Sequence, residues 1–120
     1  LGRFVVLDFW ATWCHPCVES VPDMKDLVKK YGDRLVVVSI SADEDETKWR
    51  EFTRNKKMDW PQYFDGNGRI RHLFGVRAFP TYVLIDGEGI IRQRIVGTNP
   101  QQSLTSQLRA ELKKIPKLNE

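Results

Sequence analysis

The chain has 120 residues, of which 41% are hydrophobic and 29% charged, a length that suits one globular domain with its own core and is short for two. Lysines and arginines number 19 and acidic residues 16, for a net charge of +3. The two signs are interspersed, which argues against a nucleic-acid-binding protein. No apolar stretch approaches the roughly 18 residues of a membrane-spanning helix. We therefore expect a domain that binds no nucleic acid and makes no membrane contact of its own.

The first half of the chain predicts a strand, a helix and a second strand. Residues Phe4–Trp10 form a β-branched and aromatic run of strand length. Apolar residues then recur at spacings of three and four over Val18–Tyr31, which predicts an amphipathic helix that ends at Gly32. Pro22 should kink this helix without breaking it. The continuous apolar run Leu35–Ile40 is typical of a strand buried in a parallel sheet.

The second half predicts further helices and an antiparallel hairpin, so the order of elements indicates an α/β sheet with one antiparallel edge. The elements expected here are a helix over Glu46–Lys56, a short extended piece at Pro61–Phe64, a turn at Asp65–Gly68, a brief helix over Ile70–Phe74 closed by Gly75, a hairpin of Thr81–Ile85 with Ile90–Val96, and a last helix that starts at Asn99–Pro100 and ends near Pro116.

Cys14 and Cys17 are the only cysteines, and two residues separate them. A disulfide between them closes a loop too short to stabilise the fold much by constraining the unfolded chain. A closed structural zinc site needs four ligands, and His15 and His72 are the only histidines that could complete one. The spacing therefore favours a redox-active pair.

Cys14 falls where the first predicted strand gives way to the first helix, near unpaired backbone N–H groups and the positive end of the helix dipole. Both favour a thiolate, so we expect Cys14 to be the nucleophile. Cys17, in the first helical turn, can reach back as the resolving cysteine and release a mixed disulfide. The alternative is two reduced cysteines that belong to the core.

His15 and Pro16 lie between the cysteines and are candidates for tuning the redox potential. Pro16 pre-sets a helical φ, and a protonated His15 would stabilise the neighbouring thiolate. A stabilised reduced form makes the pair more oxidising. The alternative is that His15 is an exposed loop residue with no such role.

Asp8 is the one polar interruption in the first apolar strand. A buried carboxyl has a raised pKa because burial disfavours its charged form. Such a group could pass protons to and from Cys17 during disulfide exchange. The alternative is that Asp8 faces solvent from a half-exposed strand.

Asp8–Cys17, Pro22 and Phe74–Thr81 together resemble the thioredoxin superfamily. Ser41–Asp65 and Val83–Ile90 look like its TlpA/ResA-type branch of thiol-disulfide oxidoreductases, within the AhpC/TSA-redoxin-like group. The resemblance implies a thioredoxin-like fold: a central mixed β-sheet flanked by helices, with an insert after the second strand and an antiparallel C-terminal hairpin. We expect residues 1–120 to form a single such domain, cut from a longer protein with an N-terminal extension.

The resemblance also implies a substrate groove. The sequence alone favours a trans peptide bond before Pro80, whereas the resemblance implies a cis-proline beside the disulfide. Trp13 would cover the sulfurs, and Phe79 and Thr81 would line the groove where a partner polypeptide docks.

Two positions depart from the branch that the chain resembles. Many of its members carry a glutamate three residues after the second cysteine, where this chain has Ser20, with Glu19 one position earlier. Several also have asparagine where this chain has Asp8, which matches thioredoxin itself. We therefore expect proton transfer to follow the thioredoxin pattern, and the branch's role in apocytochrome maturation is left open.

The function expected from these observations is disulfide exchange with other proteins through the Cys-His-Pro-Cys pair, as a reductant and a monomer, with an upstream redox partner and without a metal or other cofactor. We expect it outside the cytoplasm, in the periplasm or tethered to the cell envelope, with a cytoplasmic location left open. Three alternatives remain: a peroxiredoxin-like peroxide reductase, a copper or zinc metallochaperone that uses the same cysteines, and a redox-inert domain whose tryptophans serve packing or partner binding. Of the tryptophans, we expect Trp10 and Trp49 in the core.

Overall fold

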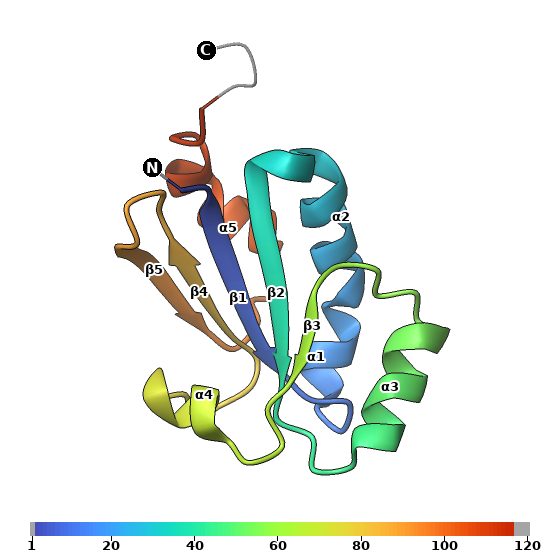
Figure 1. Ribbon diagram of the computed structural model, residues 1–120. Coiled ribbons are helices and arrows are strands. Elements are labelled where there is room, and N and C mark those ends of the chain that lie inside the picture. The colour runs from blue at the N-terminus through green and yellow to red at the C-terminus, as the bar shows by residue number, and fades with distance from the viewer. Residues whose placement is uncertain (1, 117–120) are drawn as a thin grey trace.

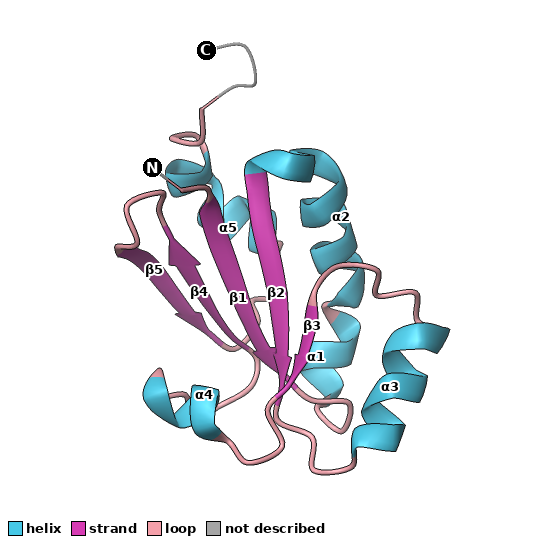
Figure 2. Ribbon diagram, in the orientation of Figure 1, coloured by secondary structure: helices cyan, strands magenta, loops and turns pink. Residues whose placement is uncertain are grey.

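A five-stranded mixed sheet forms the centre of the computed structural model, which describes residues 2–116 (Figures 1 and 2). Its strand order is β3-β2-β1-β4-β5. β1 pairs in parallel with β2, and β2 with β3, whereas β4 runs antiparallel to both β1 and β5. The α/β fold class and the antiparallel hairpin are confirmed. Of the domain predicted over residues 1–120, residue 1 and residues 117–120 lie outside the described residues. The strands are β1 (Phe4–Trp10), β2 (Leu35–Ser41), β3 (Gln62–Phe64), β4 (Thr81–Ile85) and β5 (Ile91–Val96).

Helices cover both faces of the sheet. The α-helices are α1 (His15–Glu19), α2 (Val21–Tyr31), α3 (Glu46–Asn55), α4 (Arg69–Leu73) and α5 (Leu104–Leu112). Because side chains alternate along a strand, β1 sends Val6 and Trp10 into one core cluster, with residues of α1, α2, α3 and α5, and Phe9 into another. Ile70 of α4 packs against the second cluster. The insert predicted after the second strand consists of α3 and β3, which adds an edge strand beside β2.

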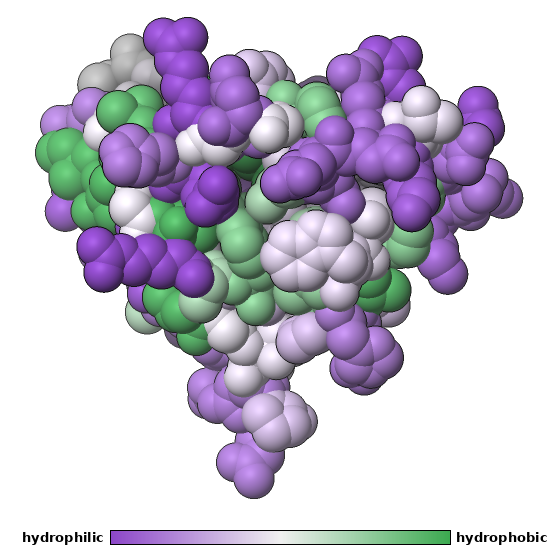
Figure 3. Space-filling model, turned by 90° about the horizontal axis from the view of Figure 1, so that it is seen from below, coloured by the Kyte–Doolittle hydropathy of each residue, from purple (hydrophilic) through white to green (hydrophobic). Residues whose placement is uncertain are grey.

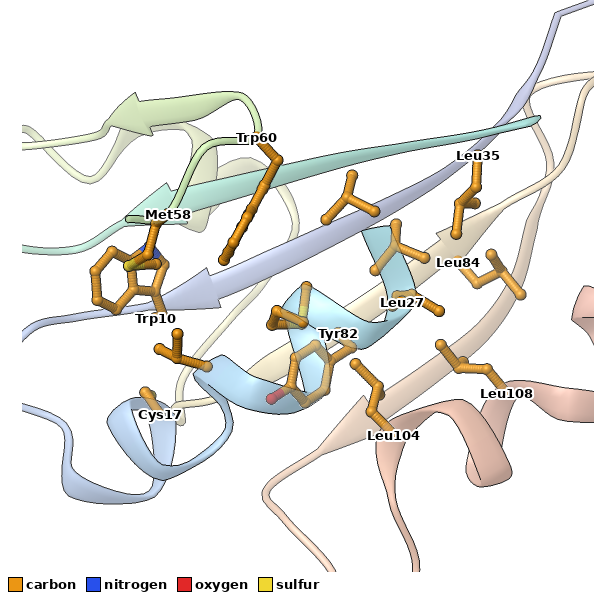
Figure 4. Close-up of a cluster of buried hydrophobic side chains, with 14 of the residues drawn as sticks. Trp10, Cys17, Leu27, Leu35, Met58, Trp60, Tyr82, Leu84, Leu104 and Leu108 are labelled. Atoms are coloured by element: carbon orange, nitrogen blue, oxygen red, sulfur yellow. The ribbon is translucent and has the colours of Figure 1, made fainter. Parts of the chain in front are cut away.

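The larger core lies between the sheet and the helices α1, α2 and α5 (Figure 4). Leu27 of α2 and Leu108 of α5 are each at most 1% exposed. Trp10 is 1% exposed and Trp49 is 9% exposed, so both expected core tryptophans are confirmed. Cys17 belongs to the same cluster, which ties the cysteine pair directly to the packed interior.

The helix predicted over Val18–Tyr31 is two helices, so the expectation of a kink at Pro22 is wrong. α1 ends at Glu19 and α2 begins at Val21, with Ser20 as the cap between them. Pro22 lacks an N–H and cannot continue the hydrogen bonds of α1, but it is tolerated in the first turn of a new helix.

The last helix starts later than predicted, at Leu104 instead of Asn99–Pro100. The Asn99 side chain accepts a hydrogen bond from the Gln101 N–H at 2.9 Å, and its carbonyl accepts one from Gln102 at 3.2 Å. These bonds make a local turn that competes with a helix. Ser103 caps α5 instead, and the helix ends at Leu112, ahead of Pro116.

Candidate active site

The two cysteines form a disulfide where β1 passes into α1. Their Cα atoms are 5.2 Å apart. Cys14 is the N-cap of α1, and its Sγ accepts a hydrogen bond from the Cys17 backbone N–H at 3.3 Å. Cys14 is 6% exposed and Cys17 is 4% exposed. A hydrogen bond from a backbone N–H stabilises a thiolate more than a thiol. The structure gives such a bond to Cys14 Sγ, so Cys14 is the cysteine whose thiolate is stabilised.

The loop before Cys14 is anchored by Asp43, a residue that the sequence interpretation missed. The Asp43 carboxylate accepts hydrogen bonds from the Thr12 backbone N–H at 3.0 Å, from the Thr12 hydroxyl at 2.6 Å and from the Ser41 hydroxyl. Asp43 itself is 3% exposed. Because β1 and β2 are parallel, the segments after their carboxyl ends meet at one edge of the sheet. The sequence signal that could have indicated Asp43 is its position just after the second predicted strand, at the edge where Thr12 follows the first strand.

We expect Asp43→Ala to lower the free energy of unfolding by about 3 kcal/mol, because it leaves the part-buried donors of Thr12 and the buried Ser41 hydroxyl without an acceptor. Urea unfolding followed by far-ultraviolet circular dichroism measures this. The matched control is Asp45→Ala, since the Asp45 carboxylate caps α3 through one exposed bond to the Lys48 N–H and should cost about 1 kcal/mol. Equal losses in the two variants would contradict an anchoring role for Asp43.

Asp8 lies in a polar row that crosses three strands. It faces Ser39 of β2 and Tyr82 of β4 in the sheet register, and the Ser39 hydroxyl donates to Asp8 Oδ2 at 2.7 Å. Asp8 is 4% exposed, and burial raises the pKa of its carboxyl to about 7, against a smaller lowering by Ser39. The alternative of a solvent-facing Asp8 is therefore wrong.

Asp8 shares the sheet face of the cysteines. In β1 the side chains of Val6, Asp8 and Trp10 point to one side, because alternate residues of a strand do so. Val6 and Trp10 belong to the core cluster that contains Cys14 and Cys17. Burial and the negative charge of Asp8 also raise the pKa of Tyr82, whose hydroxyl-bearing ring lies in the same core beside α2 (Figure 4).

His15 points away from this core. Its Nε2 lies 3.0 Å from Glu19 Oε1, one turn along α1, and both side chains are well exposed, at 85% and 66%. Exposed pairs of this kind contribute little to stability. Glu19 thus meets His15 at the surface, and Pro16 occupies the first turn of α1 as expected.

The predicted groove residues divide into exposed and buried members. Trp13 is 65% exposed and meets Phe79 edge to face, with ring centroids 5.7 Å apart. The Phe79–Pro80 peptide bond is cis, the geometry that the resemblance implies. Pro80 and Thr81 are each less than 2% exposed, and the Thr81 hydroxyl donates to the Ala78 carbonyl at 2.7 Å. The Thr81 hydroxyl is therefore bonded inside the turn, and the contribution of Thr81 to the groove stays a prediction.

Exposed apolar side chains lie on the face of the molecule seen from below the view of Figure 1. Figure 3 looks onto it and shows pale and green surface ringed by hydrophilic side chains. Leu73 of α4 is 76% exposed, and with Trp13 it is among the most exposed large hydrophobic residues of the described chain. A surface of this kind can bind an extended polypeptide.

Within residues 2–116, His, Cys, Asp and Glu side chains form no group of three or more that could hold a metal ion. His72, the second histidine considered with the cysteines, lies in α4. Likewise, none of the helices described here is both long and apolar enough to cross a membrane.

A family profile described as Thioredoxin-like matches residues 2–91. The chain belongs to the Thioredoxin-like family. It is 36% identical over 109 residues to the thiol-disulfide oxidoreductase ResA of Bacillus thuringiensis subsp. konkukian (strain 97-27), an alignment that covers 90% of this chain and 63% of that protein. Curated relatives that match at this identity are longer, and the chain spans 64% and 63% of the lengths of two of them.

Two solved structures share the fold described above. A Chlorobium tepidum protein provisionally identified as the thiol:disulfide interchange protein DsbE superposes with a TM-score of 0.84 at 31% identity, covering 92% of this chain and 79% of that one. The exposed lipoprotein thioredoxin Etrx1 of Streptococcus pneumoniae strain TIGR4 superposes with a TM-score of 0.75 at 28% identity, covering 91% of this chain and 85% of that one.

Proposed function

We propose that this chain is a thiol-disulfide oxidoreductase that exchanges disulfides with other proteins, with Cys14 as the nucleophile and Cys17 as the resolving cysteine. The observation that carries the proposal is the cysteine pair itself, closed as a disulfide at the start of α1, with Cys14 Sγ accepting the Cys17 N–H. The similarity to a ResA thiol-disulfide oxidoreductase and to a DsbE interchange protein supports it.

The reaction in the reducing direction takes place in two steps. The Cys14 thiolate attacks one sulfur of the partner's disulfide, which forms a mixed disulfide and releases the other partner sulfur as a thiolate. Cys17 then loses its proton and attacks Cys14 Sγ. The intramolecular disulfide forms, the bond between Cys14 and the partner breaks, and two electrons have passed from the dithiol to the partner. An upstream redox partner, itself a thiol protein, restores the dithiol by the reverse chemistry.

Asp8 is the proton acceptor for Cys17 in this proposal. It lies buried on the sheet face that the cysteine cluster covers, and a pKa of about 7 suits a group that takes and returns protons near neutral pH. Pro16 and His15 tune the potential of the pair. The exposed His15–Glu19 contact limits the part of His15, because Glu19 offsets the charge that a protonated imidazole would present to Cys14.

The partner polypeptide docks on the surface of Trp13 and Phe79, with the cis-proline Pro80 beneath it.

We propose that the chain works as a monomer and as a reductant, outside the cytoplasm, either in the periplasm or tethered to the envelope. The similarity to an exposed lipoprotein thioredoxin supports this location. The reaction needs no metal or other cofactor, because both electrons reside in the two sulfurs.

The test is the reduction of insulin disulfides in the presence of dithiothreitol, together with the reduction potential of the Cys14/Cys17 couple in glutathione buffers. We expect turnover well above dithiothreitol alone and a potential near the thioredoxin value of about −270 mV. A potential near about −120 mV would instead make the chain an oxidant. Absence of insulin reduction, with rapid reduction of hydrogen peroxide when dithiothreitol is the sole reductant and no other protein is present, would favour the peroxide-reductase alternative.

A further inference from the structure

The Ser39 hydroxyl, the hydrogen-bond donor to Asp8, is itself held by Trp60. Trp60 Nε1 donates to Ser39 Oγ at 2.7 Å, and Ser39 Oγ donates to Asp8 Oδ2 at 2.7 Å. Ser39 is 0% exposed and Trp60 is 6% exposed. The three side chains come from β2, from β1 and from the segment just before β3, so they form a chain of hydrogen bonds across the parallel half of the sheet.

The donor and acceptor roles in this chain are determined by chemistry. An indole N–H can only donate, so Ser39 Oγ is the acceptor in its hydrogen bond with Trp60. A serine hydroxyl has one hydrogen, and Asp8 is its acceptor among the residues that the structure describes. Trp60 therefore favours the rotamer in which Ser39 donates to Asp8. The backbone supports this, because the Ser39 N–H donates to the Pro61 carbonyl at 3.0 Å, next to Trp60.

We propose that Ser39 and Trp60 are positioning residues that hold Asp8 in its ionised form near neutral pH, so that it can accept the proton of Cys17. A donated hydrogen bond favours a carboxylate over a carboxylic acid. The inference deepens the function proposed above and rests on it only for the identity of the proton donor.

Other charged groups around Asp8 do not replace this bond. Within residues 2–116 no lysine, arginine or histidine forms a salt bridge with Asp8. Tyr82 of β4 lies opposite Asp8 in the sheet register, and Asp23 of α2 acts on Tyr82. The two cysteines belong to the core cluster on the same face of the sheet. The Ser39 hydroxyl is the group that lowers the pKa of Asp8, against the larger effect of burial.

The test is the titration of the Asp8 side-chain carbonyl by carbon-13 NMR in the oxidised protein, which requires no substrate and no turnover. In Ser39→Ala the midpoint should rise by about one pH unit, the effect expected for losing a hydrogen bond to a charged group. In Trp60→Phe the Ser39 hydroxyl remains, but it no longer accepts the indole N–H that orients and polarises it. The midpoint of Asp8 should therefore rise by less than in Ser39→Ala. An unchanged midpoint in both variants would overturn the proposal.

Two matched controls separate this effect from general damage to the core. Ser41→Ala removes another fully buried β2 hydroxyl, which donates to Asp43. Trp49→Phe removes a buried indole N–H that has no hydrogen-bond partner among the described residues. Neither should move the Asp8 midpoint by more than about 0.2 units. Equal shifts in these controls would overturn the specific role. If Ser39→Ala does not fold, Trp60→Phe decides the question.

Enzyme kinetics give a second readout. The pH dependence of insulin reduction should shift upward in Ser39→Ala and should no longer respond to that substitution in an Asp8→Asn background. A shift that persists without Asp8 would overturn the proposal. If the wild-type chain reduces no insulin at all, the proposed function fails, while the NMR titration still tests whether Ser39 and Trp60 control Asp8.

Discussion

Cys14→Ser is expected to abolish insulin reduction, with a loss of about 10³-fold or more, as removal of an essential nucleophile does in other enzymes. Serine retains the N-cap position at the start of α1, so the fold should persist. A serine hydroxyl is, however, not ionised at neutral pH and cannot form a disulfide. The measurement is the initial rate of insulin reduction at matched protein concentration.

Cys17→Ser is the matched partner of that variant. Cys14 remains able to attack, but the mixed disulfide has no resolving thiol. We expect this variant to accumulate a covalent complex with a disulfide substrate, visible as a mass increase that dithiothreitol reverses. Trapping by Cys14→Ser in place of Cys17→Ser would reverse the assignment of the two cysteines, and full activity in either variant would refute the mechanism.

Asp8→Asn is expected to make the protein more stable at high pH and less active. Burial raises the pKa of Asp8 from 3.8 to about 7, so the folded state binds this proton more tightly than the unfolded chain does. The favourable contribution of protonated Asp8 is complete below pH 3.8 and is lost as the pH rises through about 7. Asparagine does not titrate. The difference in unfolding free energy between variant and wild type should therefore grow by about 4 kcal/mol from below pH 3.8 to above pH 7.

Urea unfolding at pH 4, 6 and 8 measures this difference. Asp26→Asn serves as the control, because Asp26 lies on the exposed side of α2 and should give no comparable slope. Insulin reduction by Asp8→Asn should fall as well, since Cys17 loses its proton acceptor. A stability difference that does not change with pH would contradict a buried, titrating carboxyl at this position.

The elements of the fold and the redox pair could be predicted from local patterns in the sequence. β-branched, aromatic and continuous apolar runs located the first two strands, and the two-residue spacing of Cys14 and Cys17 indicated their chemistry. The errors fell where two local signals competed. Pro22 is compatible both with a kinked helix and with the start of a new one, and the Asn99 side chain caps a turn in a segment that also fits a helix start.

The surroundings of the site depended on strand register, which no local pattern specifies. Asp8 was recognisable as a polar residue in an apolar strand, but its donor Ser39 lies 31 positions away, and Trp60 a further 21. Asp43 reaches Thr12 over the same separation of 31. These contacts exist because β1, β2 and β3 pair in parallel. The number of residues between two strands does not reveal their register, so the contacts could not be predicted from spacing.

The sequence by itself determined the α/β fold class, the position of the cysteine pair at a strand-to-helix junction and the candidacy of Asp8. These rest on hydrophobic periodicity and on functional groups only a few residues apart. Only the tertiary structure decided that Asp8 is buried and bonded to Ser39, that Asp43 anchors the loop before Cys14, that His15 turns toward Glu19, and that the Thr81 hydroxyl faces inward. Each of these depends on which segments pack together, because burial and hydrogen bonding between distant residues arise from the assembled sheet.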